Sequence, residues 1–165
     1  MKTIIAASQK GGSGKTALVR NLSVAASQSD QKVAMLDLDP QGSLTAWWEQ
    51  RDAEAPEMPR EAKTLAGTVK GCAAAGYDRL FIDTPPATSL KSILKFADLV
   101  LIPARPSADD LRALTGTLDE LNDIPFAFVV SQAPRARLTD EAVRVLAQHG
   151  RVAPINLAMR VAYAE

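Results

Sequence analysis

Residues suited to chemistry are concentrated near the start of the chain, in the stretch KGGSGKT at positions 10–16. Three glycines, at positions 11, 12 and 14, leave room for backbone N–H groups to approach an anion closely. The stretch follows an apolar run and opens a segment with helical spacing, so the positive end of a helix would face the same point. This order of elements predicts a loop that binds the phosphates of a nucleotide.

The lysine and the threonine that end this loop have separate expected roles. Lys15 can reach the β- and γ-phosphates, and the Thr16 hydroxyl can bind Mg²⁺. We assign the nucleotide contacts of the loop to Gly11, Gly12, Ser13, Gly14, Lys15, Thr16 and Ala17. A second lysine, Lys10, precedes the glycines. Because one lysine is expected at a phosphate loop, the second one needs a separate explanation.

Three aspartates close apolar runs elsewhere in the chain: Asp37 and Asp39 in DLDPQG, and Asp83 at the end of RLFID. A carboxylate at a strand tip beside the phosphate loop can hold Mg²⁺ through water, which is the role we expect for Asp83, with a cap or turn residue as the alternative. Asp37 and Asp39 share a face because alternate strand residues do, so one of them could orient or activate a water near the γ-phosphate. Asp39 could also cap the helix that follows it.

Short apolar runs that favour buried parallel strands must position these groups. Five runs are clear and a sixth is weaker; they cover residues 3–7, 33–38, 79–83, 99–103, 126–130 and, for the weak one, 151–155. Segments with helical spacing follow the first, second, fourth and fifth runs, and residues 53–60 form a Pro- and Glu-rich surface loop. Alternating strands and helices predict one α/β domain, residues 1–165, with a doubly wound, mostly parallel sheet and helices on both faces. The carboxyl ends of the strands would bring the candidate residues together.

Composition restricts the class of protein. The 165 residues are 47% hydrophobic and 23% charged, and Lys plus Arg equals Asp plus Glu at 19 each. This balance argues against a constitutive nucleic-acid binder, although it is compatible with a local basic patch. The single cysteine, Cys72, is compatible with a reducing compartment, and we find neither an 18-residue apolar run nor an export signal. We therefore expect a cytoplasmic protein without a membrane partner.

The motifs and their order resemble those of the ParA/MinD group of P-loop ATPases. KGGSGKT is similar to the deviant Walker A motif of this group, and LFIDTPP is similar to its Walker B motif. DLDPQGSLTAW and PARPSADDL resemble motifs of ParA-type partition ATPases, the second in the small plasmid and mobile-element branch without an N-terminal DNA-binding domain. The resemblance extends from Met1 to about Tyr163. It implies a P-loop NTPase fold and a slow, Mg²⁺-dependent, partner-stimulated ATPase.

The resemblance also implies a role for the second lysine. In this family the first lysine of the motif reaches across a dimer to the nucleotide held by the other subunit, so Lys10 would contact phosphates in trans and Lys15 in cis. The water-activating aspartate of the family corresponds to Asp39, and Asp37 corresponds to the carboxylate near the metal. ATP would then stabilise a sandwich homodimer.

The resemblance also implies roles for residues in the later part of the chain. Pro106 and Ser107 would lie near the nucleotide and the dimer interface, or the prolines would have a structural role at the end of a strand. Gln132 and Pro134 would approach the adenine base. The candidates for nonspecific DNA contacts by the ATP dimer are Arg135, Arg137 and Arg160. Relatives of this branch usually continue with a further C-terminal helix, which this chain is expected to lack.

Three functions are compatible with these features. The first is a nucleoid-associated DNA partition ATPase whose homodimer is stimulated by a small centromere-binding adaptor protein. The second is a nucleotide-switched interaction module with little hydrolysis or DNA binding. The third is a MinD-like positioning ATPase, which needs an amphipathic membrane-binding helix. Residues 151–165 contain a proline and few bulky apolar residues, which disfavours the third function.

Overall fold

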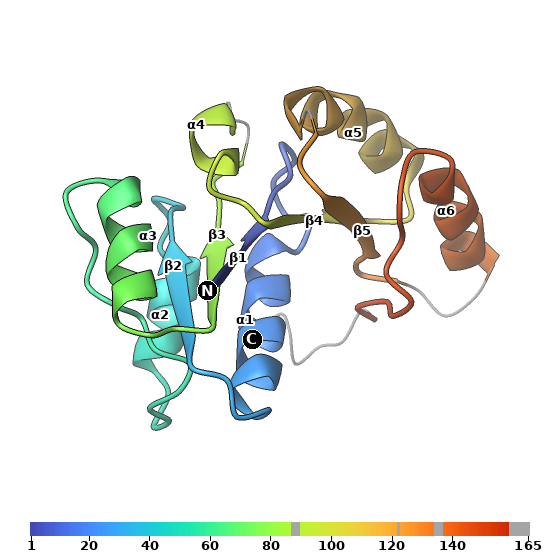
Figure 1. Cartoon of the computed structure of the whole chain (residues 1–165). Helices are drawn as coiled ribbons and strands as arrows, with labels where there is room; N and C mark the ends of the chain where they lie inside the picture. The colour runs from blue at the N-terminus through green and yellow to red at the C-terminus, as the bar shows by residue number, and fades with distance from the viewer. Residues whose placement is uncertain (87–89, 122, 134–136, 159–165) are drawn as a thin grey trace.

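Five short parallel strands form the centre of the computed structural model, which describes residues 1–86, 90–121, 123–133 and 137–158 (Figure 1). The strands are β1 (Lys2–Ala6), β2 (Val33–Asp37), β3 (Arg79–Asp83), β4 (Leu99–Ala104) and β5 (Phe126–Val130). They lie in the order β2-β3-β1-β4-β5, and every neighbouring pair is parallel. The strands are mostly apolar because a parallel sheet is covered on both faces. The predicted α/β class with a parallel sheet is confirmed.

The register of the central strands brings two predicted carboxylates to one edge of the sheet. Asp37, the last residue of β2, is opposite Asp83, the last residue of β3, and Asp83 is opposite Ala6 at the end of β1. The chain leaves β1 toward the glycine-rich loop at this same edge. Strand pairing alone therefore places the aspartates beside the loop.

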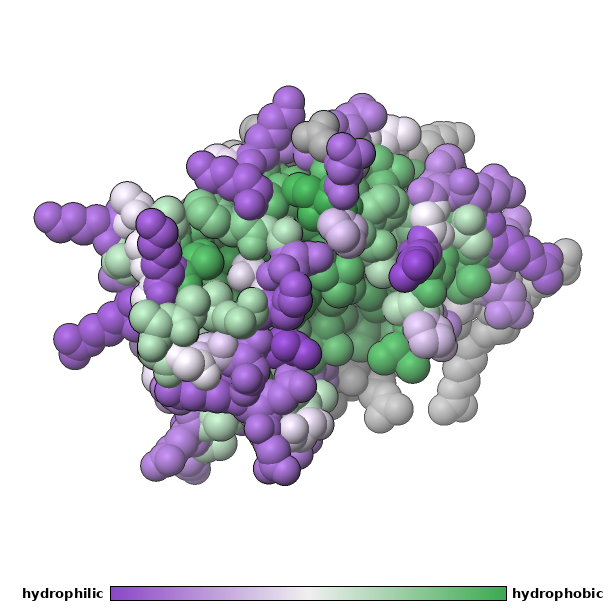
Figure 2. Space-filling view, in the orientation of Figure 1, coloured by the Kyte–Doolittle hydropathy of each residue, from purple (hydrophilic) through white to green (hydrophobic). Residues whose placement is uncertain are grey.

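Helices cover both faces of the sheet. One face carries α1 (Lys15–Ser27) and α2 (Ser43–Glu49), and the other carries α3 (Leu65–Ala74), α4 (Lys91–Leu94), α5 (Ala108–Leu121) and α6 (Arg137–Ala147). Adjacent residues of β1 serve different faces: Ile4 packs with Val19 of α1, and Ile5 belongs to the core that includes Cys72 of α3 and Leu114 of α5. On the face shown in Figure 2, apolar side chains gather toward the middle of the molecule and hydrophilic side chains project from its periphery. None of the helices in the described part of the chain is long and apolar enough to span a membrane.

The sequence pattern does not predict two of these helices. α3 contains Gly67 and Gly71, which weaken its helical signal. Its start is nevertheless fixed by Thr64, whose hydroxyl accepts a hydrogen bond from the Gly67 N–H at 3.1 Å. α4 has four residues, which is too short for a periodic pattern to be recognised. Both helices depend on packing against the core more than on local propensity.

The weak sixth strand, residues 151–155, is not formed. Val152 makes a single parallel bridge to Phe128, and the Phe128 N–H donates to the Arg151 carbonyl at 2.8 Å. Beyond Ala153, the next hydrogen bond to β5 comes from the Leu157 N–H, which donates to the Val130 carbonyl at 2.8 Å, so the strand is not continued and the bridge remains isolated. The loop expected at residues 53–60 is present, although Glu57 within it bridges to the edge of β2.

Candidate nucleotide-binding site

The glycine-rich loop lines a cavity of about 640 Å³, a volume typical of ligand sites. Gly12 and Gly14 have φ values of +68° and +102°, which other residues rarely adopt, so these positions require glycine. Gly14 is the N-cap of α1, and no side chain caps the helix there. The first N–H groups of α1 are therefore available to an anion. The cavity is lined by residues 11–17 and by Arg20, Asn21, Asp39, Gln41, Ser43, Pro86, Ser131, Gln132, Leu157 and Ala158.

Lys15 is a buried cation in this cavity. The residue is 6% exposed. Burial lowers the pKa of Lys15, while the negative charges of Asp83 and Asp39 act in the opposite direction. Because desolvation outweighs these two charges, an additional negative charge in the cavity would stabilise the ammonium group. This is the electrostatic environment that a phosphate group needs.

Thr16 and Asp83 meet between α1 and the end of β3. The Thr16 hydroxyl donates to Asp83 Oδ2 at 2.6 Å, and Asp83 is 1% exposed. Burial raises the pKa of Asp83 to about 6; the hydrogen bond from Thr16 opposes this shift and the charge of Asp37 adds to it. The second carboxylate oxygen, Oδ1, is buried and has no hydrogen-bond partner among the described residues.

This pair of side chains fits a Mg²⁺ ion. Mg²⁺ prefers oxygen ligands and is commonly held by one or two carboxylates together with water and substrate phosphates. The Thr16 hydroxyl and the unpaired Asp83 Oδ1 are oxygen donors of this kind beside the phosphate loop. Within the described ranges, no group of three or more His, Cys, Asp or Glu side chains is arranged to hold a metal alone. Phosphate oxygens and water would have to complete the coordination.

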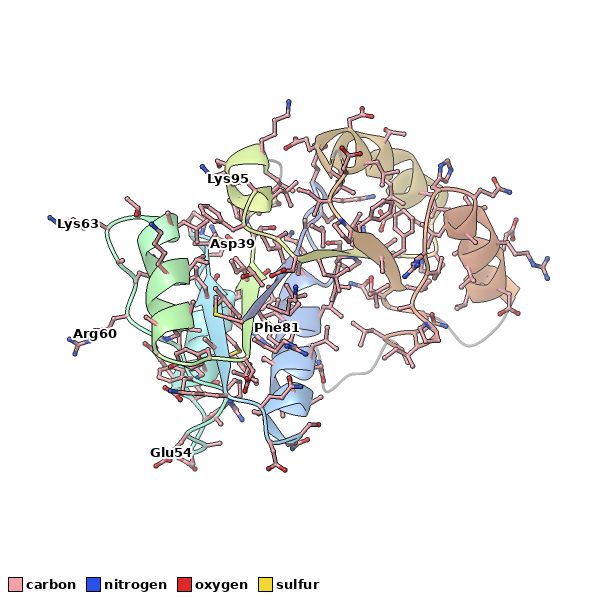
Figure 3. The ribbon with its side chains drawn as sticks, in the orientation of Figure 1. Asp39, Glu54, Arg60, Lys63, Phe81 and Lys95 are labelled. Carbon is pink, nitrogen blue, oxygen red and sulfur yellow. The ribbon has the colours of Figure 1, made fainter. Side chains whose placement is uncertain are left out.

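The turn after β2 gives Asp37 and Asp39 different surroundings. Asp37 Oδ2 accepts from the N–H and the hydroxyl of Thr45 at 2.9 and 3.2 Å, and Oδ1 accepts from the Asp39 N–H at 3.1 Å. Asp37 therefore supports the first turn of α2, and Gly42 occupies the N-cap position that the sequence left open to Asp39. Asp39 Oδ1 accepts from the Gln41 N–H at 3.0 Å, and Asp39 lines the cavity. Figure 3 shows Asp39 near the end of β2, inside the molecular outline, whereas Glu54, Arg60 and Lys63 project from the periphery.

The segment after β5 is hydrogen-bonded to the phosphate loop. Ser131 Oγ donates to the Ser13 carbonyl at 2.6 Å, and Gln132 Nε2 donates to the Gly12 carbonyl at 2.8 Å. Gln132 lines the cavity and Pro134 lies outside the described residues, so the predicted contacts with an adenine base stay a prediction. Ser131 is not among the residues that the sequence predicts for this site. Its position directly after a strand, at the edge where ligands bind in such folds, is the signal that could have found it.

Arg20 is a second cavity residue that sequence reasoning misses. Its Nη2 donates to the Ser43 carbonyl at 2.8 Å, and its guanidinium carbon lies 5.3 Å from the ring centre of Trp47. Burial lowers the pKa of Arg20, against the charges of Asp83 and Asp37. Arg20 follows Thr16 by four residues and so shares its helix face, which is the available sequence signal. The contact joins α1 to the start of α2.

Lys10 lies at a different place from Lys15. It does not line the 640 Å³ cavity. Its Nζ forms an ion pair with Asp110 in the first turn of α5, and Arg105 pairs with the same carboxylate. Asp110 lies within the PARPSADDL motif, but the motif itself predicts no role for this residue. The separation of 100 positions in sequence hides the pairing from any local pattern.

Ser107 has a structural role at the start of α5. Its hydroxyl accepts from the Asp110 N–H at 3.2 Å, and its carbonyl accepts from the Leu111 N–H at 3.0 Å. These are the contacts of a helix-capping serine. Neither Pro106 nor Ser107 lines the cavity, so a role of this segment at a dimer interface stays a prediction.

Comparison with known proteins agrees with this geometry. The family model for the CobQ/CobB/MinD/ParA nucleotide binding domain matches residues 4–159. The chain is 30% identical over 152 residues to Maintenance of carboxysome distribution protein A of Halothiobacillus neapolitanus, an alignment covering 83% of this chain and 69% of that protein. It is 31% identical over 119 residues to Protein ParA of Rhizobium radiobacter, covering 67% of this chain and 51% of that protein. The chain therefore spans about half the length of the second relative.

A solved structure shows the same fold. The plasmid partition protein of Borrelia burgdorferi B31, bound to AMPPNP, matches with a TM-score of 0.76 over 98% of this chain and 86% of that chain. The sequence identity of 18% makes this likeness a statement about fold alone. The match to the family model spans most of the chain and includes every motif of the cavity. The chain therefore belongs to the CobQ/CobB/MinD/ParA family of P-loop nucleotide-binding proteins, and its motifs and relatives place it with the ParA-type partition ATPases.

Proposed function

We propose that the chain binds and hydrolyses ATP with Mg²⁺ and uses this cycle, as a homodimer on DNA, to position or partition a cargo. One observation carries the proposal: Lys15, the Thr16–Asp83 pair and Asp39 gather around the phosphate loop at one edge of the sheet. Each of these groups has a recognised use in phosphoryl transfer to water. The AMPPNP complex of the Borrelia protein supports an adenosine triphosphate as the ligand of this fold.

The groups of the chain would divide the work on the triphosphate. The N–H groups at the start of α1 would bind phosphate oxygens, and Lys15 would neutralise charge between the β- and γ-phosphates. Thr16 and Asp83 would hold Mg²⁺, which when bound neutralises phosphate charge and fixes the phosphate geometry. Burial of Lys15 and Asp83 strengthens these electrostatic contacts relative to water.

Asp39 would orient the attacking water and accept its proton. Among the hydrogen bonds of the described residues, Asp39 uses Oδ1 alone, which leaves Oδ2 for a water. Asp37 and Arg20 would keep the turn in place, because Asp37 holds Thr45 and Arg20 holds the Ser43 carbonyl. A positioned base of this kind contributes about 10²- to 10⁴-fold to a rate.

Lys10 would complete the site in a homodimer. It lies outside the cavity of its own chain, so its charge is not part of the cis phosphate site. A lysine supplied by a second subunit would neutralise the triphosphate and make dimer stability depend on the nucleotide. Basal hydrolysis by a single chain would accordingly be slow, and a small adaptor protein that favours the active dimer would stimulate it.

DNA is the surface on which we expect the dimer to act. The net charge of zero predicts weak DNA binding by a monomer, and dimerisation would double the number of arginines on one face. The side chains of the candidates Arg135, Arg137 and Arg160 lie outside the described part of the structure. Affinity should fall with salt, with a log–log slope of roughly −0.9 per phosphate contact. A second candidate cargo is a carboxysome, since one relative is a carboxysome distribution protein.

ATP turnover with and without DNA, measured together with molar mass in ATP and ADP, tests the proposal. We expect Mg²⁺-dependent turnover and a dimer that forms with ATP. Dimer formation without turnover would favour the nucleotide-switched interaction module. Absence of both turnover and dimer would contradict the proposal.

A further inference from the structure

The ion pair between Lys10 and Asp110 indicates how the second lysine is controlled. We propose that Asp110, assisted by Arg105, is a positioning residue that holds Lys10 on its own chain and thereby sets the affinity of the nucleotide-dependent dimer. The inference rests on the proposed function, because the destination of a released Lys10 is the nucleotide of a second subunit.

Asp110 is a buried carboxylate with two cationic partners. Its Oδ1 contacts Lys10 Nζ, while Arg105 makes two contacts, from Nε to Oδ2 and from Nη2 to Oδ1, the latter at 3.0 Å. The Asp110 side chain is 3% exposed, whereas that of Lys10 is 34% exposed. Burial alone would raise the pKa of Asp110, but hydrogen bonds from Arg105 and Lys10 hold it below its ordinary value. The group is therefore charged at neutral pH and needs at least one cation.

Arg105 makes the departure of Lys10 possible. Removing one partner from a buried ion pair is normally costly because an unpaired charge stays behind. Here the bidentate guanidinium of Arg105 would remain on both oxygens of Asp110. Lys10, with a flexible stem and a single contact, is the partner suited to leave. The Ser107 cap keeps Asp110 in place when it does.

The backbone before Lys10 is fixed to α5, so the lysine side chain alone has to swing. The Gln9 N–H donates to Thr117 Oγ1 at 3.4 Å, and Gln9 Nε2 donates to Glu120 Oε1 at 3.1 Å. Held in this way, Lys10 borders a separate cavity of about 10 Å³ shared with Asp110 and with Ser13 of the loop. That volume is about one water molecule, too small for a phosphate group. In this position Lys10 pairs with Asp110 and does not line the 640 Å³ cavity of its own chain.

Docking of Lys10 should lower the apparent affinity of the dimer. When a fraction of the chains has a binding-competent side chain, the apparent Kd rises by the reciprocal of that fraction. If Lys10 is docked in about nine of ten chains, the penalty is about tenfold per chain and about a hundredfold for a symmetric dimer that uses both lysines. Removing the Asp110 carboxylate should recover part of this loss in apparent affinity.

Sedimentation in saturating Mg–AMPPNP measures the dimer Kd. Asp110→Asn should tighten the dimer by about tenfold or more. Arg105→Gln leaves Lys10 as the one cation on Asp110 and should weaken the dimer. Asp119→Asn, which removes the same charge from an exposed position of the same helix, should change nothing. Both active effects should disappear in a Lys10→Ala background. Shifts of the same sign in Asp110→Asn and Arg105→Gln, or shifts that persist without Lys10, would overturn the inference.

A labelling experiment separates failure of this inference from failure of the proposed function. Acetylation of Lys10 by an N-hydroxysuccinimide ester, quantified by mass spectrometry without nucleotide, should be several-fold faster in Asp110→Asn than in the wild type and in Asp119→Asn. Equal rates of Lys10 acetylation in the wild type and in a folded Asp110→Asn protein would overturn the proposal that Asp110 holds Lys10, whether or not the chain dimerises. Faster labelling without an AMPPNP dimer in any variant would overturn the proposed function and, with it, control of dimer affinity. If Asp110→Asn does not fold, Arg105→Gln carries both tests, with slower labelling and a weaker dimer expected.

Discussion

Lys10 and Lys15 lie at the two ends of one glycine-rich loop, in contrasting surroundings. Lys15 begins α1, is 6% exposed and faces the nucleotide cavity with Asp83 and Asp39 nearby. Lys10 has a side chain that is 34% exposed and pairs with Asp110 of α5, outside that cavity. Two lysines separated by a few glycines thus differ in exposure, in partner and in the cavity that they border. The proposals above assign the first to nucleotide binding and the second to the dimer.

The carboxylates near the two lysines also differ in their partners and in the direction of their pKa shifts. Asp83 has one buried oxygen without a partner among the described residues, and burial raises its pKa to about 6. Asp110 is held by two cations, and its pKa is lowered in spite of burial. A ligand at the first site would satisfy an unpaired group and stabilise the fold. A dimer that uses Lys10 must first break a satisfied contact.

Replacing Lys15 by alanine should have the largest effect on turnover at the phosphate loop. We expect turnover to fall by about 10²-fold or more, since removal of one preorganised group that stabilises transition-state charge costs about this much. Nucleotide affinity should fall as well, because we expect Lys15 to contact the phosphates in the ground state too. Steady-state turnover and equilibrium binding of a fluorescent ATP analogue measure the two effects. Lys63→Ala is the matched control, because Lys63 is exposed and projects from the periphery (Figure 3). Normal turnover in Lys15→Ala would remove the phosphate-loop assignment.

Asp39→Ala should slow hydrolysis by about 10²-fold while ATP affinity stays close to that of the wild type. The reason is that a water-positioning carboxylate acts mainly in the transition state. The variant should therefore accumulate a long-lived ATP dimer, seen by single-turnover hydrolysis and sedimentation. Asp37→Ala should instead weaken ATP binding too, because it removes the acceptor for Thr45 and loosens α2. Reduced affinity with normal turnover at saturation would make Asp39 a binding residue.

The raised pKa of Asp83 should have a smaller effect, which is on how the free energy of unfolding depends on pH. Its pKa is about 6 in the folded chain and 3.8 ordinarily, so the folded state holds the proton more tightly than the unfolded state between these values. Its contribution to the free energy of unfolding is fully present below about pH 4 and is lost as pH rises through about 6, a loss on the order of 3 kcal/mol. Asp83→Asn should remove this slope and raise the melting temperature at pH 7 without nucleotide.

Thermal melts of wild type and Asp83→Asn between pH 4 and 7 give the measurement, with the exposed Asp52→Asn as the control. In the same samples Mg²⁺ with ATP should stabilise the wild type more than Asp83→Asn, because the variant lacks a charged metal ligand. A pH slope that is identical in both proteins would show that Asp83 is not the titrating group.

The sequence was sufficient for the five strands and for the residues that the structure brings together at the phosphate loop. Buried parallel strands are continuous apolar runs, and the groups that matter follow them directly, as Asp83 follows its strand. The two glycines with positive φ have to be glycine, so the loop is legible in the sequence itself. The pairing Asp37–Asp83 then follows from strand register.

The features of the fold and of the site that the sequence does not predict depend on contacts between distant segments. Asp110 becomes important because α5 brings it to Lys10, and Arg20 because α1 brings it to the Ser43 carbonyl. α3 was hidden because its glycines weaken the helical signal, although its apolar side chains pack in the core. The sixth apolar run is not a strand because its backbone leaves the path along β5 after Ala153. In each case tertiary packing outweighed a local pattern.

Light scattering tests most directly whether the nucleotide-dependent dimer uses Lys10. It gives the molar mass of the wild type and of Lys10→Ala with Mg–AMPPNP, with ADP and without nucleotide. The wild type should double its mass with Mg–AMPPNP and remain a monomer in the other two conditions. Lys10→Ala should stay monomeric or dimerise about tenfold more weakly. Its melting temperature should be close to that of the wild type, because Arg105 still pairs with Asp110. A wild-type mass that is the same in all three conditions, or a Lys10→Ala dimer as tight as that of the wild type, would contradict the account.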